Sequence, residues 1–433
     1  MTGYHDITPR MGAAYDVFGD GKTSLKVNLG KYLQAASNDA PYTISNPATT
    51  FQQTTNRSWN DVNRNRIVDC NLMTRGAEDN SASGGDICGP WQNLNFGNPF
   101  STTTVNPDIL HGWGVRPYDW QFGVTVQREL LPRVAVDVSY NRRWFGNHFV
   151  TDNRAIGPQD FDVATITAPR NTNLPNGGGY PVGFVTRNSR SPLGATDNYF
   201  TFAGDYGDVT TYWHGFDVTV NARTANGIRF QGGTSTGRGV RDFCEVTGKL
   251  PELYVTLGSI VPNEQVDACA VTEPWLTTYR SLVTYTVPKI SVLLSGSLRS
   301  TPGAQPAPNG TVVATNGGAL AANSNLTNDS LQLLGSSLGR PFVVGLPFQT
   351  VNLLLPGQRY GDRVNALDLR VAKVLRLNHY KVDVGFDFYN LFNANTGTGF
   401  NQLYDVATNG AAWLRPTAIL NPRFARFNAT VNF

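Results

Sequence analysis

The stretch of this chain with the clearest chemical spacing is a polar loop that begins at Asp61. Oxygen-bearing side chains recur there at alternate positions, Asp61, Asn63 and Asn65, and a further carboxylate follows at Asp69. At the position between Asn65 and Asp69 in this alternating series, Ile67 can supply its backbone carbonyl oxygen. Carboxylate, amide and backbone carbonyl oxygens are the ligands that Ca²⁺ prefers. The spacing therefore predicts a calcium-binding loop, in which the ion would stiffen a surface segment.

Two positions depart from the calcium pattern. Loops of the EF-hand kind place Gly at the sharp turn and a bidentate acid at the end, whereas this chain has Arg66 and Leu72 there. The alternative is a solvated Asn/Asp turn, held in place by a disulfide. The sequence indicates no cofactor other than calcium.

The cysteines fall into two local pairs, Cys70 with Cys88 and Cys244 with Cys269. Each pair lies in a stretch rich in polar and turn-forming residues, and neither has metal-ligand spacing. Local pairs in surface segments persist as disulfides where the compartment is oxidising. We therefore expect two loop disulfides, with free thiols as the alternative.

Residue types that perform catalysis are present but scattered. The five histidines form no spaced pair, and Asp205 and Asp208 are explained more simply as parts of a polar loop than as an acid/base pair. We therefore expect no enzymatic activity and assign no catalytic residue.

The elements that must position these loops are predicted to be β-strands joined in hairpins. Residues 120–126 alternate apolar and polar, a turn of about four residues follows, and residues 134–140 alternate again. Comparable hairpins are predicted within 11–29, 216–230, 275–294 and 367–388. With the C-terminal strand, the pattern predicts about eleven antiparallel strands.

Composition supports an all-β membrane protein. Charged residues make up 15% of the chain and 44 residues are Gly, whereas soluble domains have roughly 25% charged residues. No apolar run is long enough for a transmembrane helix. The negative mean hydropathy is compatible with a barrel, because polar inner positions dilute the apolar signal of each strand. The net charge of +3, without a Lys/Arg-rich block, argues against a nucleic-acid partner.

Long segments without a clear period separate the hairpins. They cover about 34–118, 146–210, 239–274, 301–364 and 393–422. Structureless loops of this size are uncommon in compact soluble domains, whereas short turns at one end and long loops at the other are typical of outer-membrane barrels. Both cysteine pairs lie in the long-loop set, as an oxidising exterior would require. We therefore predict a single barrel domain with long extracellular loops.

The terminal strand predicts which side chains face lipid. Phe427, Val431 and Phe433 share one face of it, and polar residues such as Arg426 share the other. We interpret the three apolar residues as the signal for the barrel-assembly machinery, with outer-membrane lipid as the surrounding partner. Aromatic residues near strand ends are predicted to form interfacial girdles: Trp120, Trp144, Phe145, Trp213, Trp275, Tyr389 and Phe433. Polar residues are predicted to line the lumen at Gln121, Gln127, Asp137, Asp217, Asp368, Arg370, Lys381 and Asp383.

An odd strand number is unexpected for a complete barrel. Bacterial single-chain barrels have even numbers of strands, and the N-terminal residues show no signal peptide, which an exported protein needs. We therefore expect the chain to be a fragment of a longer protein.

Several segments together resemble one known family. The segments are 6–15, 18–23, 113–144, 360–365, 367–373 and 387–393, the last containing Asn-Leu-Phe-Asn. They resemble the C-terminal barrel of TonB-dependent outer-membrane receptors, most of all the Oar-like branch, which typically carries a carboxypeptidase-regulatory-like domain. The resemblance implies a 22-stranded barrel closed by a plug, of which this chain would be about the last half and would lack the plug. It also implies transport driven through an inner-membrane energy-coupling protein.

The sequence thus predicts the barrel portion of an outer-membrane transporter, with external loops that bind an unknown cargo and a lumen that passes it. One alternative is a self-contained outer-membrane porin or adhesin. Another is a secreted all-β protein that binds or cleaves glycans, whose apolar stripes would pack inward against a second sheet.

Overall fold

The computed structural model describes residues 3–35, 42–44, 46–101, 103–191, 195–256, 265–303, 323–343, 348–377 and 380–432. Its main element is a 12-stranded antiparallel sheet in which strand neighbours in space are also neighbours along the chain. The main path runs through β2 (Arg10–Asp16), β3 (Thr23–Leu33), β9 (Tyr118–Leu131), β10 (Val134–Gly146), β15 (Thr210–Arg223), β16 (Ile228–Asp242), β18 (Leu276–Val287), β19 (Val292–Gly303), β22 (Gly361–Leu377), β23 (Tyr380–Tyr389) and β26 (Phe424–Asn432). The short strand β17 (Ala270–Thr272) pairs with β16. The eleven strands of this path confirm the number expected from periodicity.

The register keeps the apolar residues of neighbouring strands on one face. Val124 pairs with Tyr140, and Tyr140 pairs with Phe216; at the other edge, Val371 pairs with Phe386, which pairs with Phe427. Because side chains alternate along a strand, a slip of one residue would move each apolar set to the polar face. Matching periods therefore select this register.

The apolar face is exposed. Val138 is 46% exposed, Phe216 48% and Val371 44%, so these stripes do not pack inward against a second sheet. The alternative of a secreted all-β protein that binds or cleaves glycans is therefore wrong, because such a protein would bury these side chains.

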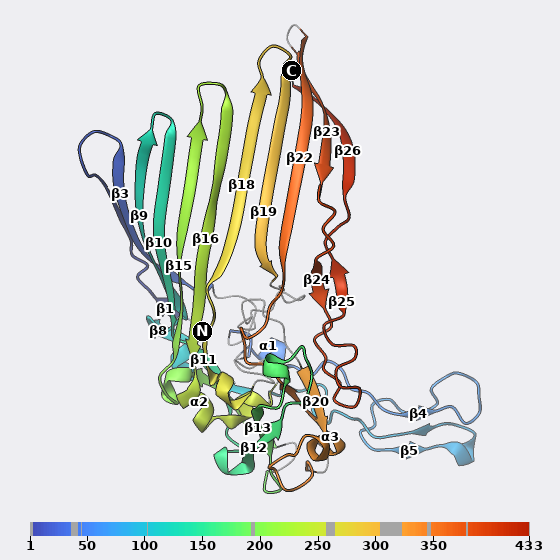
Figure 1. Ribbon diagram of the computed structural model, residues 1–433. Coiled ribbons are helices and arrows are strands. Elements are labelled where there is room, and N and C mark those ends of the chain that lie inside the picture. The colour runs from blue at the N-terminus through green and yellow to red at the C-terminus, as the bar shows by residue number, and fades with distance from the viewer. Residues whose placement is uncertain are drawn as a thin grey trace.

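Short turns gather at one end of the sheet and long connections at the other (Figure 1). In the first turn Gly19 and Gly21 have positive φ angles of 71° and 73°, which Gly adopts without steric cost. The two-residue turn between β9 and β10 places Arg133 at φ 69°. The turn predicted near Asn378 lies outside the described residues.

The long connections are folded, although their sequences show no clear period. Their paired strands are β1 (Gly3–His5) with β8 (His111–Trp113); β4 (Trp59–Asn60) and β5 (Glu78–Asp79) with β6 (Ile87–Cys88); β7 (Thr103–Val105) and β11 (Phe149–Asn153) with β14 (Asn198–Phe202); β12 (Phe161–Thr167) with β13 (Pro181–Arg187); β20 (Asn323–Thr327) with β21 (Phe348–Asn352); and β24 (Gly397–Phe400) with β25 (Pro416–Ile419). Their helices are α1 (Pro47–Thr50), α2 (Cys244–Lys249) and α3 (Asn328–Leu333), with 3-10 turns η1 (Ser81–Ser83), η2 (Pro107–Ile109), η3 (Pro158–Asp160), η4 (Pro175–Gly177), η5 (Ala203–Asp205), η6 (Pro251–Tyr254) and η7 (Val266–Cys269). These elements are too short for a periodic signal.

Two hydrophobic cores join four of the long connections into one unit, which we call the loop body. The first core brings together Phe184 from 146–210, Leu353 from 301–364, and Tyr404 from 393–422. The second joins Val150 from 146–210 to Val246 from 239–274. The loop body lies beyond the ends of the strands, opposite the short turns (Figure 1).

The remaining long connection carries an arm. Residues 56–93, which include β4, β5 and β6, project sideways from the loop body (Figure 1).

Within the part of the chain that the structure describes, the sheet is open, since β2 and β26 pair with β3 and β23 but not with each other. Across the same residues, the structure has no helix that is long and apolar enough to cross a membrane.

Candidate functional site

The polar face of the sheet carries the residues that the sequence predicted to line a lumen. Register places on this face Gln121, Gln127, Asp137, Asp217, Asp368, Arg370 and Asp383. The backbone of Lys381 pairs with Asn432, but the side chain of Lys381 lies outside the described residues. The face is therefore continuous across the sheet, although a lumen also requires a closed barrel.

Charge pairing on the polar face centres on Asp387, which is only 5% exposed. Arg370 and Arg426 flank it in register. Arg370 donates from Nη1 to Asp387 Oδ1 at 3.0 Å, and Arg426 donates from Nη2 to Oδ2 at 3.0 Å. Asn428 donates to the same Oδ2 at 2.6 Å. This network was not predicted, because the strand pattern gives the face of each residue but not its partners.

Smaller polar pairs cross the other strands of this face. Arg143 binds Asp119 through Nε at 2.8 Å, Asn141 donates to Asp217 at 2.6 Å, and Lys26 donates to Gln127 at 2.8 Å. Hydration and cross-strand pairing are therefore the evident roles of most of these side chains.

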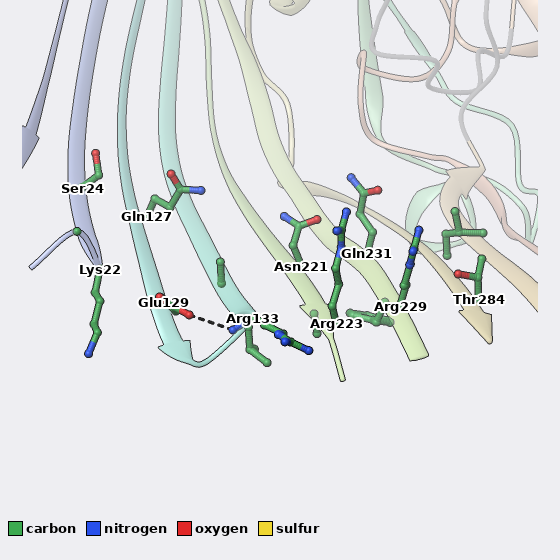
Figure 2. A pocket seen from close by; sticks show the side chains of 16 residues that line it. Lys22, Ser24, Gln127, Glu129, Arg133, Asn221, Arg223, Arg229, Gln231 and Thr284 are labelled. Carbon is green, nitrogen blue, oxygen red and sulfur yellow. Dashed lines mark hydrogen bonds between the residues drawn. The ribbon is translucent and has the colours of Figure 1, made fainter. Parts of the chain in front are cut away.

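Near the short turns, the polar face holds a basic pocket of about 860 Å³. Lys22, Arg133, Arg223 and Arg229 line it together with one acid, Glu129 (Figure 2). Arg223 and Arg229 are directly opposite each other on β15 and β16, a placement in which like charges repel. The pocket thus offers an electropositive surface at the turn end of the polar face.

The loop body is held together by polar contacts between different loops as well as by its cores. Arg340 donates to Asp162 at 2.6 Å, and Tyr180 Oη donates to the carbonyl of Leu353 at 2.9 Å. Asn171 donates to the Asn409 carbonyl at 2.9 Å. These contacts fix the loops relative to one another, so they present one preorganised surface.

The loop body also buries a carboxylic acid, Glu252 on η6, which is 3% exposed. Its Oε1 accepts the backbone N–H of Asn153 at 3.3 Å, whereas its Oε2 has no partner. Burial raises the pKa of Glu252 to about 7, and the nearby Asp152 carboxylate also raises it. Asp152 itself accepts a hydrogen bond from Tyr206 Oη at 2.6 Å.

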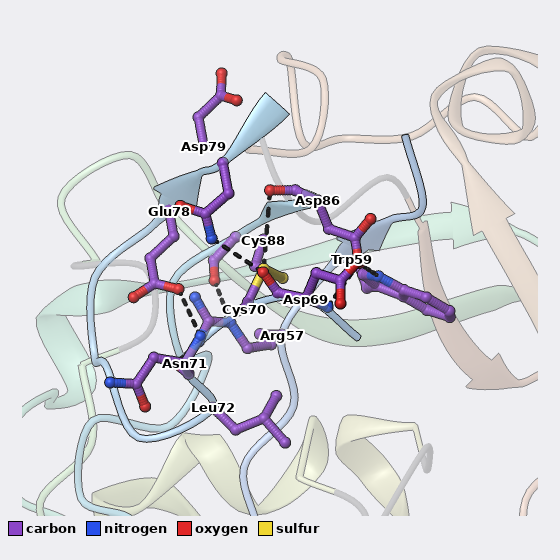
Figure 3. Close-up of a disulfide and its surroundings, with 12 residues drawn as sticks. Arg57, Trp59, Asp69, Cys70, Asn71, Leu72, Glu78, Asp79, Asp86 and Cys88 are labelled. Carbon is purple, nitrogen blue, oxygen red and sulfur yellow. Dashed lines mark hydrogen bonds between the residues drawn. A yellow bond between two sulfur atoms is a disulfide. The ribbon is translucent and has the colours of Figure 1, made fainter. Parts of the chain in front are cut away.

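Both predicted disulfides are formed, Cys70 with Cys88 in the arm and Cys244 with Cys269 in the loop body. In the arm, Arg57 donates to four backbone carbonyls, those of Gly89, Asn71, Thr74 and Gly76. The buried Asp86 carboxylate accepts hydrogen bonds from Trp59 Nε1 and from the backbone N–H of Asp69, both at 2.8 Å (Figure 3). It also accepts the backbone N–H of Val62 at 3.2 Å. These bonds, the Asp69 amide first, lower the pKa of Asp86. Asp86 and Arg57 are the organising residues that sequence reasoning missed.

The predicted calcium loop lies in this arm and is closed by its own hydrogen bonds. Asn63 and Asn65 donate their amide N–H groups to Asp69 Oδ2 at 2.7 and 2.8 Å. Asp61 Oδ2 accepts the backbone N–H of Arg66 at 2.8 Å, and its Oδ1 has no partner. Among the residues that the structure describes, no group of three His, Cys, Asp or Glu side chains could hold a metal ion. Calcium binding by Asp61, Asn63, Asn65, the Ile67 carbonyl and Asp69 stays a prediction.

The apolar side chains of the C-terminal strand face lipid, whereas some of the predicted girdle residues do not. Phe427 is 62% exposed and Val431 50% on the apolar face, and Phe433 lies outside the described residues. Three predicted girdle residues lie instead on the polar face: Phe145, Trp213 and Tyr389. Strand alternation places Trp213 on this face. Glycines at 215 and 237 leave room for its ring, because a Cβ at Gly237 would lie only 2.2 Å from a ring carbon.

The chain matches one family of known proteins and is similar to several solved structures. Residues 1–233, more than half of the chain, match the model of the "Outer membrane beta barrel domain" family, whereas no curated protein sequence matches. The fold is similar to that of the outer membrane transporter YddB from Escherichia coli, with a TM-score of 0.45 and 9% identity over 96% of this chain and 39% of that one. It is also similar to the siderophore receptor PirA from Acinetobacter baumannii, with a TM-score of 0.39 and 10% identity over 98% of this chain and 40% of that one.

The chain therefore spans less than half the length of either solved structure. The family match and the exposed apolar face agree on the environment of the sheet. The chain belongs to the outer-membrane β-barrel domain family, and its location is the bacterial outer membrane.

Proposed function

We propose that this chain is the C-terminal barrel portion of a TonB-dependent transporter of the Oar-like branch. Its external loops contact a cargo and its polar face lines the path that the cargo takes. The carrying observation is that four long loops fold into one body beyond one end of a polar-faced sheet. A preorganised loop surface binds a ligand without first losing entropy to order the loops.

The Asn-Leu-Phe-Asn element supports this proposal, because its residues have a definite structural task. The buried Asn390 donates to the carbonyls of Ala394 and Asn421, and its backbone N–H donates to Asp368 Oδ1 at 2.8 Å. Asn393 accepts the backbone N–H of Arg423 at 2.9 Å. The element thereby ties the end of β23 to β22 and to the chain that enters β26.

The open edges favour a partial barrel over a self-contained porin. A sheet in lipid must close, because unpaired backbone groups at an edge cost several kcal/mol each. The main path supplies eleven strands with β2 and β26 as edges, so closure requires further strands. We place these strands, and the contact with the inner-membrane energy-coupling protein, in a longer protein of which this chain is part.

The proposal includes no covalent chemistry by this chain. Passage would be gated, and the barrel-assembly machinery would insert the chain by way of the terminal strand that contains Phe427 and Val431.

The test is uptake by the native bacterium. Culture media of the wild type, of a strain that lacks the gene and of a strain that lacks the energy-coupling protein would be compared by mass spectrometry. We expect at least one compound to be depleted by the wild type alone. Depletion that persists without the coupling protein, or steady conductance of the purified chain in a planar bilayer, would favour the porin and overturn the proposal.

A further inference from the structure

Acidic and basic side chains are distributed differently between the two faces of the main sheet, and the transport proposal does not explain the difference. Among the described main-sheet strands, acids occupy the polar face at Asp16, Asp119, Glu129, Asp137, Asp217, Asp362, Asp368, Asp383 and Asp387. The outward acid of these strands is Asp242, at the loop end of β16, and its Oδ1 accepts the backbone N–H of Cys244 at 2.9 Å. Cations, in contrast, do face outward near the loop end: Lys31, Arg142, Arg238 and Arg363.

Two of these cations lie in one row across three strands. Arg142 on β10 pairs with His214 on β15, and His214 pairs with Arg238 on β16. Neighbouring strands are about 4.8 Å apart, which separates the two arginine Cα atoms by roughly 10 Å. The row lies among the apolar side chains of the lipid-facing surface, with Tyr140 and Phe216 on the side toward the membrane centre.

Aromatic rings hold both guanidinium groups. Arg142 Cζ lies 4.8 Å from the ring centre of Tyr212, and Arg238 Cζ lies 5.0 Å from that of Trp275. Arg238 also donates from Nε to His214 Nε2 at 3.0 Å, and the rings of His214 and Trp275 are 5.0 Å apart. Stacking on a ring uses the face of a guanidinium and leaves N–H groups at its edge for other acceptors. We call this set the outward arginine–aromatic cluster: Arg142, Tyr212, His214, Arg238 and Trp275.

The cluster adjoins a hollow on the outward surface. A pocket of about 620 Å³ is lined by Arg142 together with Phe122, Trp144 and Tyr212. The rings of Trp120 and Trp144 stack beside it, with centres 6.2 Å apart. Apolar walls with one charged group suit a ligand that has both acyl chains and an anionic headgroup.

The structure gives neither arginine a carboxylate partner among the described residues. Two acids near Arg238 have other partners: Asp242 Oδ1 accepts the backbone N–H of Cys244 at 2.9 Å, and Glu273 Oε2 accepts the backbone N–H of Gly239 at 3.2 Å. An Arg that faces lipid costs least near the membrane interface, where an anionic headgroup supplies the missing countercharge.

We propose that the outward arginine–aromatic cluster binds a phosphorylated lipid of the outer leaflet. The phosphate groups accept from Arg142 and Arg238, since guanidinium and phosphate match as bidentate partners, and the acyl chains lie along the apolar face below. The proposal requires only the membrane location of the sheet, and not the transport function.

The probe is bisphosphorylated lipid A, compared with the same lipid stripped of both phosphates. The chain isolated from outer membranes in detergent would be mixed with each lipid, and bound lipid would be counted by native mass spectrometry. We expect the phosphorylated form to be retained about tenfold better, since each interfacial Arg adds attraction for an anionic lipid. Equal retention by the wild-type chain would overturn the proposal without any variant.

Two double variants locate the site. Arg142→Gln with Arg238→Gln should abolish the preference for the phosphorylated lipid. Arg280→Gln with Arg299→Gln removes the same charge from a directly opposed pair on the polar face of β18 and β19, and should leave the preference intact. If the variant with Arg142→Gln and Arg238→Gln still prefers the phosphorylated lipid, the assignment is wrong. Displacement of the lipid by millimolar inorganic phosphate would also contradict it, because that result would indicate a site for the free ion.

Discussion

The membrane sheet and the loop body bury their apolar side chains in opposite ways. In the loop body, Tyr404, Phe184 and Leu353 are fully buried. In the sheet, Phe427 is 62% exposed and Phe386 50% exposed. The largest fully buried side chains of the described residues all lie in the long connections rather than in the main-sheet strands.

This difference shows that two solvents act on one chain. The loop body folds as a soluble domain does, by removing apolar surface from water. The sheet leaves its apolar face exposed because lipid, not protein, covers it. A substitution should therefore affect the stability of the two regions for different physical reasons, and four changes test this difference.

The largest effect is expected for Val124→Arg, at the middle of β9 on the apolar face. A charge near the bilayer centre costs about 2–4 kcal/mol, so the variant should reach the outer membrane in a reduced amount. The matched control is Thr125→Arg, one residue further on and on the polar face, which loses the hydrogen bond to Ser139 Oγ and places a second cation opposite Lys26. Outer-membrane yield and heat-modifiable gel mobility measure the difference. Equal yields for the two variants would contradict the assignment of the lipid-facing side.

The second change tests whether the polar face is held by its own charge pairs. Asp387→Asn removes the countercharge of Arg370 and Arg426. Removal of one partner from a buried pair costs about 3–5 kcal/mol, and partial exposure of both arginines reduces this to about 2 kcal/mol. Urea unfolding in detergent should show that loss. Asp137 lies on the same face and forms no ion pair among the residues that the structure describes, so Asp137→Asn should change the free energy of unfolding little. Similar midpoints for the two variants would mean that the network adds no stability.

The third change should act on the arm alone. Asp86→Ala removes the acceptor of three hydrogen bonds, from Trp59, Val62 and Asp69. Hydrogen bonds to a charged group are stronger than those between neutral groups. Their loss should accelerate amide exchange within 56–93 and leave the main sheet unchanged. The control is Asp79→Ala, which removes an exposed carboxylate from the same arm and should change amide exchange less. Faster exchange in the sheet strands after Asp86→Ala would show that the arm is not an independent unit.

The two regions also differ in how far sequence reasoning reaches. Strand positions and faces were predictable, because Val124, Tyr140 and Phe216 repeat with the period that lipid imposes. The two disulfides followed from local cysteine spacing. The loop body was not predictable, since Phe184, Leu353 and Tyr404 come from three distant segments and meet only in three dimensions. For the same reason Asp387 and Asp86 were missed, because their roles depend on partners from other segments.

The smallest effect is expected from pH, and it concerns the loop body. Glu252 has a pKa of about 7 in the folded protein against 4.5 for the unperturbed group, chiefly because of burial. Folding raises the pKa of this carboxylate, so its ionisation destabilises the folded state. The free energy of unfolding should therefore fall as pH rises from about 4.5 to 7 and stay level above 7. Glu252→Gln removes this dependence and should stabilise the loop body by roughly 1–2 kcal/mol at pH 8, with little change at pH 4. Amide exchange of peptides 149–153 and 250–254 at both values provides the measurement. The core around Leu253 implies that the loop body excludes water at Glu252. Identical exchange of wild type and variant at pH 8 would contradict this, because it would show that the carboxylate is solvated.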